Sequence, residues 1–266
     1  MTRNSLNVLT WNIDRNETDI SSRYDNILLE ILKTNADIVC LQENFKSEKL
    51  SVAKSLIENH DYNLINSNEK DMFVLAKNCT EVQPLADSIT EDYLAAGFLK
   101  IKNHKLLVGS AHLSWGTGKE NVRLAEILSI ENLFKAHTDL DPFRGENKII
   151  GILCGDLNTE PESSSIRFLK GLGVENHIST MWTDSWVVGN GEGITSSSSN
   201  LLAGRTAKSV GLSTGNLPNR RIDYILVRGY AYSRPGEFES SVLVGVTENK
   251  DLACSDHYGI LTKILL

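Results

Sequence analysis

Two polar side chains follow a short apolar run near the middle of the chain. Residues 148–154 (KIIGILC) are long enough for a buried strand and too short for a helix of ordinary length, and Gly155 ends the run. Asp156 and Asn158 come next, and in an extended segment side chains two positions apart point the same way. This spacing places a proton-accepting carboxylate beside an amide that can hold a water molecule or an oxyanion. A simple strand-to-helix turn is the alternative, because Asp and Asn are common in turns and Pro161 suits the first turn of a helix.

Comparable polar groups lie at or beside other strand-like segments. They are Asn12 with Asp14, Glu43, His112, Asp223, and Asp256 with His257. Each has an ordinary explanation by itself: a polar loop, a structural histidine, or a glutamate favoured at a helix N-terminus. Their repeated place at strand ends favours a site, because open α/β sheets often bind ligands at the carboxyl edge of buried strands.

The residue types at these ends suit hydrolysis at phosphorus. The chain has neither a Walker-type phosphate loop nor a Gly-x-Ser-x-Gly nucleophile turn. Carboxylates without clustered cysteines favour a hard cation with oxygen ligands, Mg²⁺ or Mn²⁺. With such a cation, an Asp orients and deprotonates water, while the cation and a protonated His stabilise charge on the phosphoryl oxygens.

The hydrophobic pattern predicts the elements that position these groups. Strands are predicted over residues 6–11, 36–41, 62–65, 72–76, 94–101, 105–111, 148–154, 222–227, 241–246 and 260–265, and helices from residue 22 to about 35 and over 46–59, 120–136 and 163–172. Arg123, in the first turns of the third helix, is expected to face the end of the preceding strand and bind substrate. Residues 80–92 are predicted as a surface loop, and the Gly-, Ser- and Asn-rich stretch 189–219 as a long functional or mobile loop.

Composition bounds the class of protein. The 266 residues are 41% hydrophobic and 23% charged, as in a water-soluble protein, and we expect one domain over residues 1–266. The formal net charge of −7 argues against tight non-specific binding to a nucleic-acid backbone. The four cysteines lack zinc-site spacing, and no signal-peptide core or membrane span is evident. We therefore expect a cytoplasmic protein without stable membrane insertion, and a monomer.

Six short motifs, in order, resemble the signature of the endonuclease/exonuclease/phosphatase superfamily, the deoxyribonuclease I-like proteins. They are Trp-Asn-Ile-Asp (11–14), Leu-Gln-Glu (41–43), Ser-Ala-His-Leu (110–113), Gly-Asp-Leu-Asn (155–158), Arg-Ile-Asp-Tyr (221–224) and Ser-Asp-His (255–257). The resemblance runs from about residue 6 to the C-terminus. It implies a four-layer α/β sandwich in which two mostly antiparallel sheets pack face to face with helices outside.

The resemblance also implies a role for each residue. Glu43 becomes the principal Mg²⁺ ligand, with Asp14 and Asp256 near the cation. Asn12 and Asn158 position phosphate and water, Asp156 activates the water, and His112 contacts a phosphoryl oxygen. Asp223 interrupts the apolar alternation of its strand and should have a buried partner. Arg221 is one candidate partner, because in a strand it lies on the same face as Asp223, two residues away. The resemblance favours His257, paired with Asp223 at the scissile phosphate.

Within the superfamily, the first and third motifs are most similar to the tyrosyl-DNA phosphodiesterase and neutral sphingomyelinase branches. The Pro-Ala-Trp signature of inositol phosphatases is absent. We interpret the chain as a Mg²⁺-dependent phosphodiester hydrolase of nuclease type, with nucleic acid among the candidate substrates. A phospholipid diesterase, a phosphomonoesterase and a catalytically inactive binding module are the alternatives.

Overall fold

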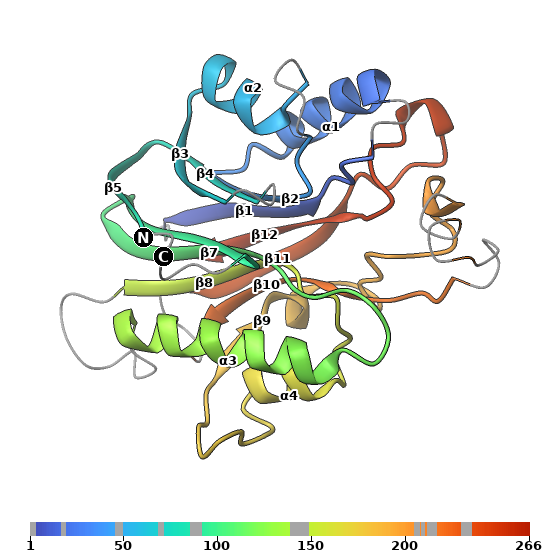
Figure 1. Cartoon of the computed structure of the whole chain (residues 1–266). Coiled ribbons are helices and arrows are strands. Elements are labelled where there is room, and N and C mark those ends of the chain that lie inside the picture. The colour runs from blue at the N-terminus through green and yellow to red at the C-terminus, as the bar shows by residue number, and fades with distance from the viewer. Residues whose placement is uncertain are drawn as a thin grey trace.

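The chain forms two β-sheets that pack face to face. The structure, a computed structural model, describes residues 4–16, 20–45, 50–68, 72–85, 92–138, 149–204, 208, 211, 217–229 and 236–266. Within these ranges each sheet has six strands, and helices cover its outer face (Figure 1). This arrangement confirms the predicted four-layer α/β sandwich.

The first sheet has the strand order β11-β12-β1-β2-β4-β3. Its strands are β1 (Ser5–Asn12), β2 (Ile38–Gln42), β3 (Tyr62–Ser67), β4 (Phe73–Lys77), β11 (Glu237–Val244) and β12 (Gly259–Leu265). The pair β1–β2 is parallel, and the other neighbouring pairs are antiparallel.

The second sheet has the order β5-β6-β7-β8-β10-β9. Its strands are β5 (Cys79–Pro84), β6 (Leu94–Ile101), β7 (His104–His112), β8 (Ile149–Asp156), β9 (Trp182–Asp184) and β10 (Asp223–Arg228). Here β7–β8 is the parallel pair, and the other neighbours are antiparallel.

Helices cover the outer face of each sheet. Figure 1 shows α1 (Ile20–Thr34) and α2 (Val52–Asn59) over the first sheet, and α3 (Glu120–His137) and α4 (Ser164–Leu169) over the second. Short 3₁₀ helices, η1 (Ser185–Val188) and η3 (Lys250–Leu252), lie in connections. No helix in the described ranges is both long and apolar enough to cross a membrane.

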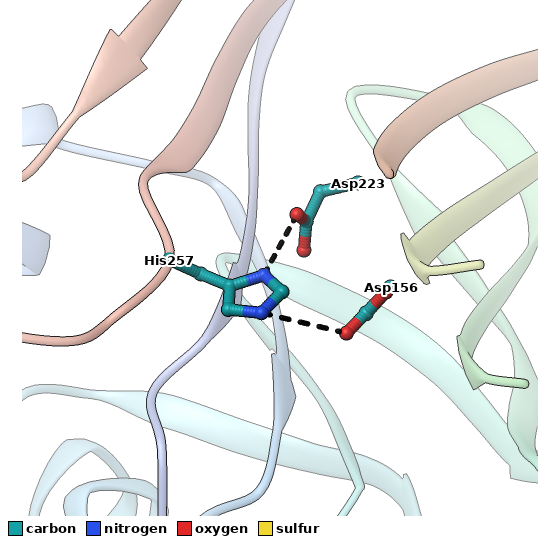
Figure 2. Close-up of side chains that lie close together, drawn as sticks. All are labelled: Asp156, Asp223 and His257. Atoms are coloured by element: carbon teal, nitrogen blue, oxygen red, sulfur yellow. Dashed lines mark hydrogen bonds and ion pairs between the residues drawn. The ribbon is translucent and has the colours of Figure 1, made fainter. Parts of the chain in front are cut away.

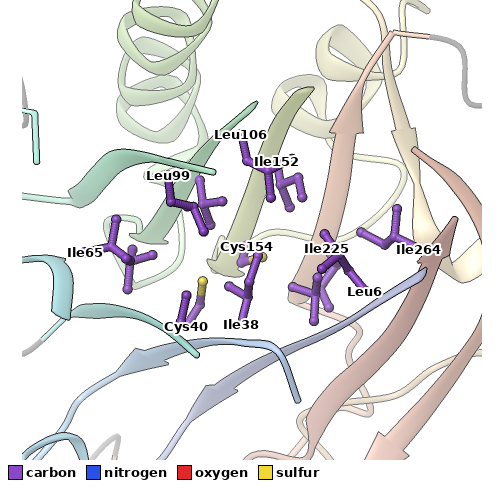
Figure 3. Close-up of a cluster of buried hydrophobic side chains, with 14 of the residues drawn as sticks. Leu6, Ile38, Cys40, Ile65, Leu99, Leu106, Ile152, Cys154, Ile225 and Ile264 are labelled. Carbon is purple, nitrogen blue, oxygen red and sulfur yellow. The ribbon is translucent and has the colours of Figure 1, made fainter. Parts of the chain in front are cut away.

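Three apolar clusters hold the layers together. The central one lies between the sheets, where Leu6, Ile38, Ile152 and Ile225 meet (Figure 3). A second joins α1 and α2 to the first sheet, and a third joins α3 and α4 to the second. The inner strands, such as β2, β8 and β10, are therefore buried on both faces, which explains why they have continuous apolar runs rather than simple alternation.

One polar contact crosses the central layer close to the strand ends. Gln42, the last residue of β2, donates through Nε2 to Ser110 Oγ on β7 at 2.9 Å, and Ser110 Oγ donates to the Leu41 carbonyl at 3.2 Å. All of these groups are buried. The two sheets are thus joined by hydrogen bonds as well as by apolar packing.

Some elements differ from the sequence prediction. Residues 79–84, predicted mostly as surface loop, form the edge strand β5, whose side chains are largely exposed. Of the helix predicted from residue 46, residues 46–49 lie outside the described ranges, and α2 begins at Val52 after the Ser51 cap. The helix predicted to reach Leu172 ends at Leu169, and Gly171 adopts a φ of 74°, which favours glycine.

Candidate active site

The predicted strand-end residues meet at one end of the sandwich. In each sheet the parallel pair, β1–β2 or β7–β8, brings two carboxyl ends together. Strands β10 and β12 run antiparallel to their neighbours, so their first residues lie at this same end. In Figure 1 it is the right-hand end, while both chain termini lie at the left.

Asp156 lies at the centre of the site. Its buried Oδ2 accepts from Asn12 Nδ2 at 3.1 Å and lies 3.7 Å from His112 Nε2 and 3.9 Å from His257 Nε2. Figure 2 shows His257 between Asp156 and Asp223. The second carboxylate oxygen, Oδ1, accepts from the Asn158 amide nitrogen at 2.8 Å. This carboxylate is therefore fixed, with one oxygen facing an amide and two imidazoles.

The predicted contact between His257 and Asp223 is present. Nδ1 of His257 lies 2.9 Å from Asp223 Oδ2, and Arg221, the alternative partner, instead donates to Asp184 at 2.7 Å. Burial would lower the pKa of His257, but the charges of Asp223 and Asp156 outweigh it and hold the pKa well above 6.5. Burial also raises the pKa of Asp223, against the charge of His257. Among the described residues, Asp223 Oδ1 has no hydrogen-bond partner.

Glu43 contacts the same cluster from the first sheet. Its Oε1 accepts from Asn12 Nδ2 at 3.2 Å and lies 3.8 Å from His112 Nε2. Asn12 thus bridges the carboxylates of Glu43 and Asp156. A φ of 55° at Glu43 turns the chain just past β2, and 23% of its side chain is exposed. The side chain is accessible to a bound ion or substrate.

Asp14 is held differently from its neighbours in the site. Its amide nitrogen donates to Asn12 Oδ1 at 3.0 Å, its φ is 51°, and its Oδ2 lies 3.3 Å from the buried Arg23 guanidinium. Arg23 also donates to the carbonyls of Ile13, Asn16 and Cys254. A helix α1 side chain therefore connects the loop after β1 to the loop before β12.

Asn158 contacts Asp156 through its amide nitrogen, and Asp256 precedes His257 in the chain. Asp256 is half-buried, and its charge is among those that raise the pKa of His257. Asn158 has a φ of 52° and donates through Nδ2 to the Leu113 carbonyl at 3.0 Å. Its chain therefore departs from the extended geometry from which a shared direction with Asp156 was inferred.

Arg123 faces the strand end, as predicted. It donates from Nη1 to the carbonyls of Ser114 and Gly116 at 3.0 and 3.1 Å, and from Nε to Glu120 at 3.0 Å. These contacts fix the loop that follows His112. Its role in substrate binding stays a prediction.

Two further side chains at the site, Thr195 and Arg15, were not found from the sequence, whereas Arg220 is one of four basic residues, with Arg205, Lys208 and Arg221, that the sequence offers for a local groove beside the long loop. The buried Thr195 hydroxyl accepts from the Asp223 amide nitrogen at 3.3 Å. Arg15 Nε lies 3.7 Å from Glu43 Oε2, and Arg220 donates to the Asn158 carbonyl at 3.3 Å. Arg15 and Arg220 are each close in sequence to a predicted motif, whereas nothing local to Thr195 indicates its place. Of these basic residues, Arg205 lies outside the described residues.

A sequence model of the Endonuclease/Exonuclease/phosphatase family matches residues 9–257, which include every residue of this site. The chain belongs to this family. The resemblance inferred from six short motifs is therefore confirmed. No curated protein matches the sequence.

Solved structures of this family's fold superpose over nearly the whole chain. Humanized TDP2 from D. rerio has a TM-score of 0.72 at 17% identity, with 98% of this chain and 99% of that chain covered. An endonuclease/exonuclease/phosphatase family protein from Bacteroides thetaiotaomicron gives 0.68 at 16% identity, covering 100% and 96%. The human Nocturnin catalytic domain, solved with a bound sulfate anion, gives 0.60 at 17% identity, covering 99% and 95%. At these identities the likeness establishes the fold alone.

Proposed function

We propose that this protein is a Mg²⁺-dependent phosphodiester hydrolase of nuclease type. One observation carries the proposal: Asp156 Oδ2 faces the Asn12 amide, His112 and His257 within 3.9 Å. A buried carboxylate surrounded by one amide and two imidazoles suits the transfer of a proton from water beside an anionic phosphate. Family members act on phosphoesters, so the site chemistry and the family agree.

Each polar side chain then has a distinct task. Asp156 orients the attacking water and accepts its proton, and the amides of Asn12 and Asn158 hold the water and the phosphate. His257, fixed through Nδ1 by Asp223, directs Nε2 at the phosphate. His112 donates to another phosphoryl oxygen. Because these groups are fixed before substrate binds, little reorganisation is needed during the reaction.

The donor set at Glu43 fits a hard divalent cation. Glu43 offers partly exposed carboxylate oxygens, and Asp14 and Asp256 add carboxylates nearby. The arginine beside Asp14, Arg23, is buried at 3.3 Å from Oδ2, whereas the arginine 3.7 Å from Glu43, Arg15, is half exposed, so we propose Glu43 as the principal ligand. When bound, Mg²⁺ or Mn²⁺ would supply charge stabilisation at the phosphoryl oxygens.

A second group of possible ligands is Asp156, Asp223 and His257, whose donor atoms lie within 4.8 Å of one another. The hydrogen bond between His257 Nδ1 and Asp223 Oδ2 already uses one possible metal-ligand atom of each residue. We therefore assign this group to proton transfer and phosphate contact rather than to the cation.

Nucleic acid is the substrate class that we propose, acted on by a cytoplasmic, monomeric protein with one domain over residues 1–266. The TDP2 structure from D. rerio was solved in complex with a single-strand DNA product, and its fold matches here with a TM-score of 0.72 at 17% identity. The net charge of −7 favours weak binding to intact duplex at physiological salt.

A panel of phosphoesters with Mg²⁺ or Mn²⁺ tests the proposal. The panel contains single-stranded DNA, plasmid, 5′-tyrosyl DNA, RNA, sphingomyelin, bis-p-nitrophenyl phosphate and a phosphomonoester. We expect cleavage of a nucleic-acid diester that EDTA abolishes, and loss of turnover in Glu43→Gln with an unchanged urea midpoint. Full activity of Glu43→Gln in saturating Mg²⁺ would refute the cation assignment. Hydrolysis of the lipid or the monoester alone, or of nothing in the panel, would refute the nuclease proposal.

A further inference from the structure

Trp115 is a large apolar side chain that is exposed and lies three residues after His112 in the chain. It lies in the connection between β7 and α3 and is 66% exposed. Trp11 and Trp182 are fully buried, and Trp186 is partly buried. A single exposed apolar residue is common on protein surfaces, so exposure alone assigns no role. The surroundings of Trp115 supply the further evidence.

The backbone on both sides of Trp115 is held by helix α3. Glu126 accepts from the Ser114 amide nitrogen at 3.0 Å and from Ser114 Oγ at 2.6 Å. Arg123 donates to the carbonyls of Ser114 and Gly116 at 3.0 and 3.1 Å. Four hydrogen bonds thus fix the residues that flank Trp115. A ligand that stacks on this indole would order little additional chain, and its binding would lose correspondingly little entropy.

The same connection is joined directly to the catalytic cluster. Leu113 donates its amide nitrogen to the Asp156 carbonyl at 3.0 Å and accepts from Asn158 Nδ2 at 3.0 Å. Trp115 follows His112 by three residues, a span of at most about 10 Å of extended chain. The indole is therefore within reach of a group attached next to a phosphate bound at His112 and Asp156.

Two guanidinium groups lie on other sides of the cluster. Arg15 is half exposed beside Glu43, and Arg220 contacts the Asn158 carbonyl and is partly exposed. Each is paired with a carboxylate, Arg15 with Glu43 at 3.7 Å and Arg220 with Glu160 at 3.0 Å, and each keeps an exposed part. A phosphate of a bound strand can share either guanidinium with its carboxylate, while the bases of the strand remain free to stack.

We propose that Trp115 is the stacking surface for an unpaired nucleobase next to the scissile phosphate, so that the substrate is a single strand. The inference rests on the proposed nuclease function and names the substrate form for that site. Paired bases in a duplex are already stacked on each other, whereas an unpaired base has a free face that aromatic side chains bind.

The polarity of the connection distinguishes a base from a lipid surface. The neighbours of Trp115 along the chain, Ser114 and residues 116–119 (GTGK), have no other apolar side chain. Insertion into a membrane would require a wider apolar face. One flat aromatic ring in a polar loop suits a base better.

Binding in EDTA separates this inference from catalysis. Fluorescence anisotropy would compare a labelled short oligothymidylate with an abasic deoxyribose-phosphate strand of the same length. Wild type should bind the oligothymidylate more tightly. Trp115→Ala should weaken that binding about 5- to 150-fold, the range of base–aromatic stacking, and should weaken abasic binding less than about twofold. Trp115→Phe should restore most of the affinity.

The matched control is Val187→Ala, at an apolar side chain that is also 66% exposed but lies in η1. It should leave both affinities unchanged. Equal losses on both strands in Trp115→Ala, or no preference of wild type for the strand with bases, would overturn the inference. Trp115-dependent binding to phosphatidylcholine vesicles would also overturn it, in favour of a lipid surface. Because no turnover is measured, a failure here is distinct from an absence of hydrolysis.

Discussion

His257 and Asp223 form a hydrogen bond of 2.9 Å although they lie 34 positions apart in the chain. The carboxylate is fully buried at the start of β10, and the histidine precedes β12 in the opposite sheet. The pair therefore joins the two sheets at the candidate site.

A double-mutant cycle tests whether this pair acts as a unit. We expect His257→Ala to lower kcat about 10²- to 10⁴-fold, and Asp223→Asn to lower it by a smaller factor in that range, because each change disrupts one positioned proton donor. The double variant should lose clearly less than the product of the two factors. Steady-state kinetics on the preferred diester give the four rates. Multiplicative losses would mean that the residues act independently.

Arg23 is predicted to contribute strongly to stability. Its guanidinium is almost fully buried, faces the Phe45 ring and donates to four backbone carbonyls, so Arg23→Met removes these hydrogen bonds and the ion pair with Asp14. We expect a loss of about 3–5 kcal/mol in the free energy of unfolding, measured by urea denaturation. Lys33→Ala, which removes an exposed ion pair with Glu30 on the same helix, should cost less than about 1 kcal/mol. Similar costs for the two variants would contradict this account.

The environment of Glu120 predicts that the stability of the folded protein falls as the pH is lowered into the acid range. Burial would raise the pKa of Glu120, but hydrogen bonds from Ser165, Arg123 and Thr159 outweigh it and lower the pKa below 4.5. A lowered pKa stabilises the folded state above the unfolded value of 4.5, and this contribution is lost as pH falls through the folded value. The difference in urea midpoint between wild type and Glu120→Gln should therefore be full near pH 6 and shrink toward pH 3. A constant difference would show that the charge of Glu120 is not responsible.

Gly155 is predicted to tolerate no side chain. Its φ is 139°, and an added Cβ would lie 1.9 Å from the Ala111 carbonyl oxygen, a backbone atom of the neighbouring strand. Gly155→Ala should cost about 4 kcal/mol or more, or prevent folding. Gly116→Ala is the matched control, because its φ of 104° is also unfavourable but nothing lies within 4 Å. That variant should lose only about 1–2 kcal/mol. Equal urea midpoints for the two variants would show that the close approach has no cost.

The sequence predicted the strand ends well because buried strands have a strong apolar signal. Leu94–Ile101 was predicted at its observed bounds, whereas β8 continues through Gly155 to Asp156, two residues beyond the predicted end at Cys154. The edge strand β5 was missed because its exposed side chains have no apolar pattern. Edge strands are defined by pairing with a neighbour, which local sequence does not encode.

The site residues also differ in whether the local sequence reveals them. Asp223 was identified because a carboxylate in an apolar strand needs a partner, and its contact with His257 is present. The turns at Asp14 and Asn158, with φ near 50°, depart from the extended geometry that was assumed beyond the strand ends, and at Asn158 the turn agrees with the strand-to-helix alternative. Thr195 contacts the site through a hydroxyl from a remote loop, so only the folded chain reveals it.

The site is assembled from both sheets, so its geometry depends on how the two sheets are registered against each other. Asn12 and Glu43 come from the first sheet, whereas Asp156 and Asp223 come from the second, and the contacts between the halves are only 2.9–3.9 Å long. A displacement of about 1 Å can reduce a rate about 100-fold without unfolding a protein. Substitutions in the central cluster, such as at Ile38 or Ile225, would thus let one sheet slide over the other and reduce turnover while the global fold persists. The packing between the two sheets therefore sets the distances between the residues of the candidate active site.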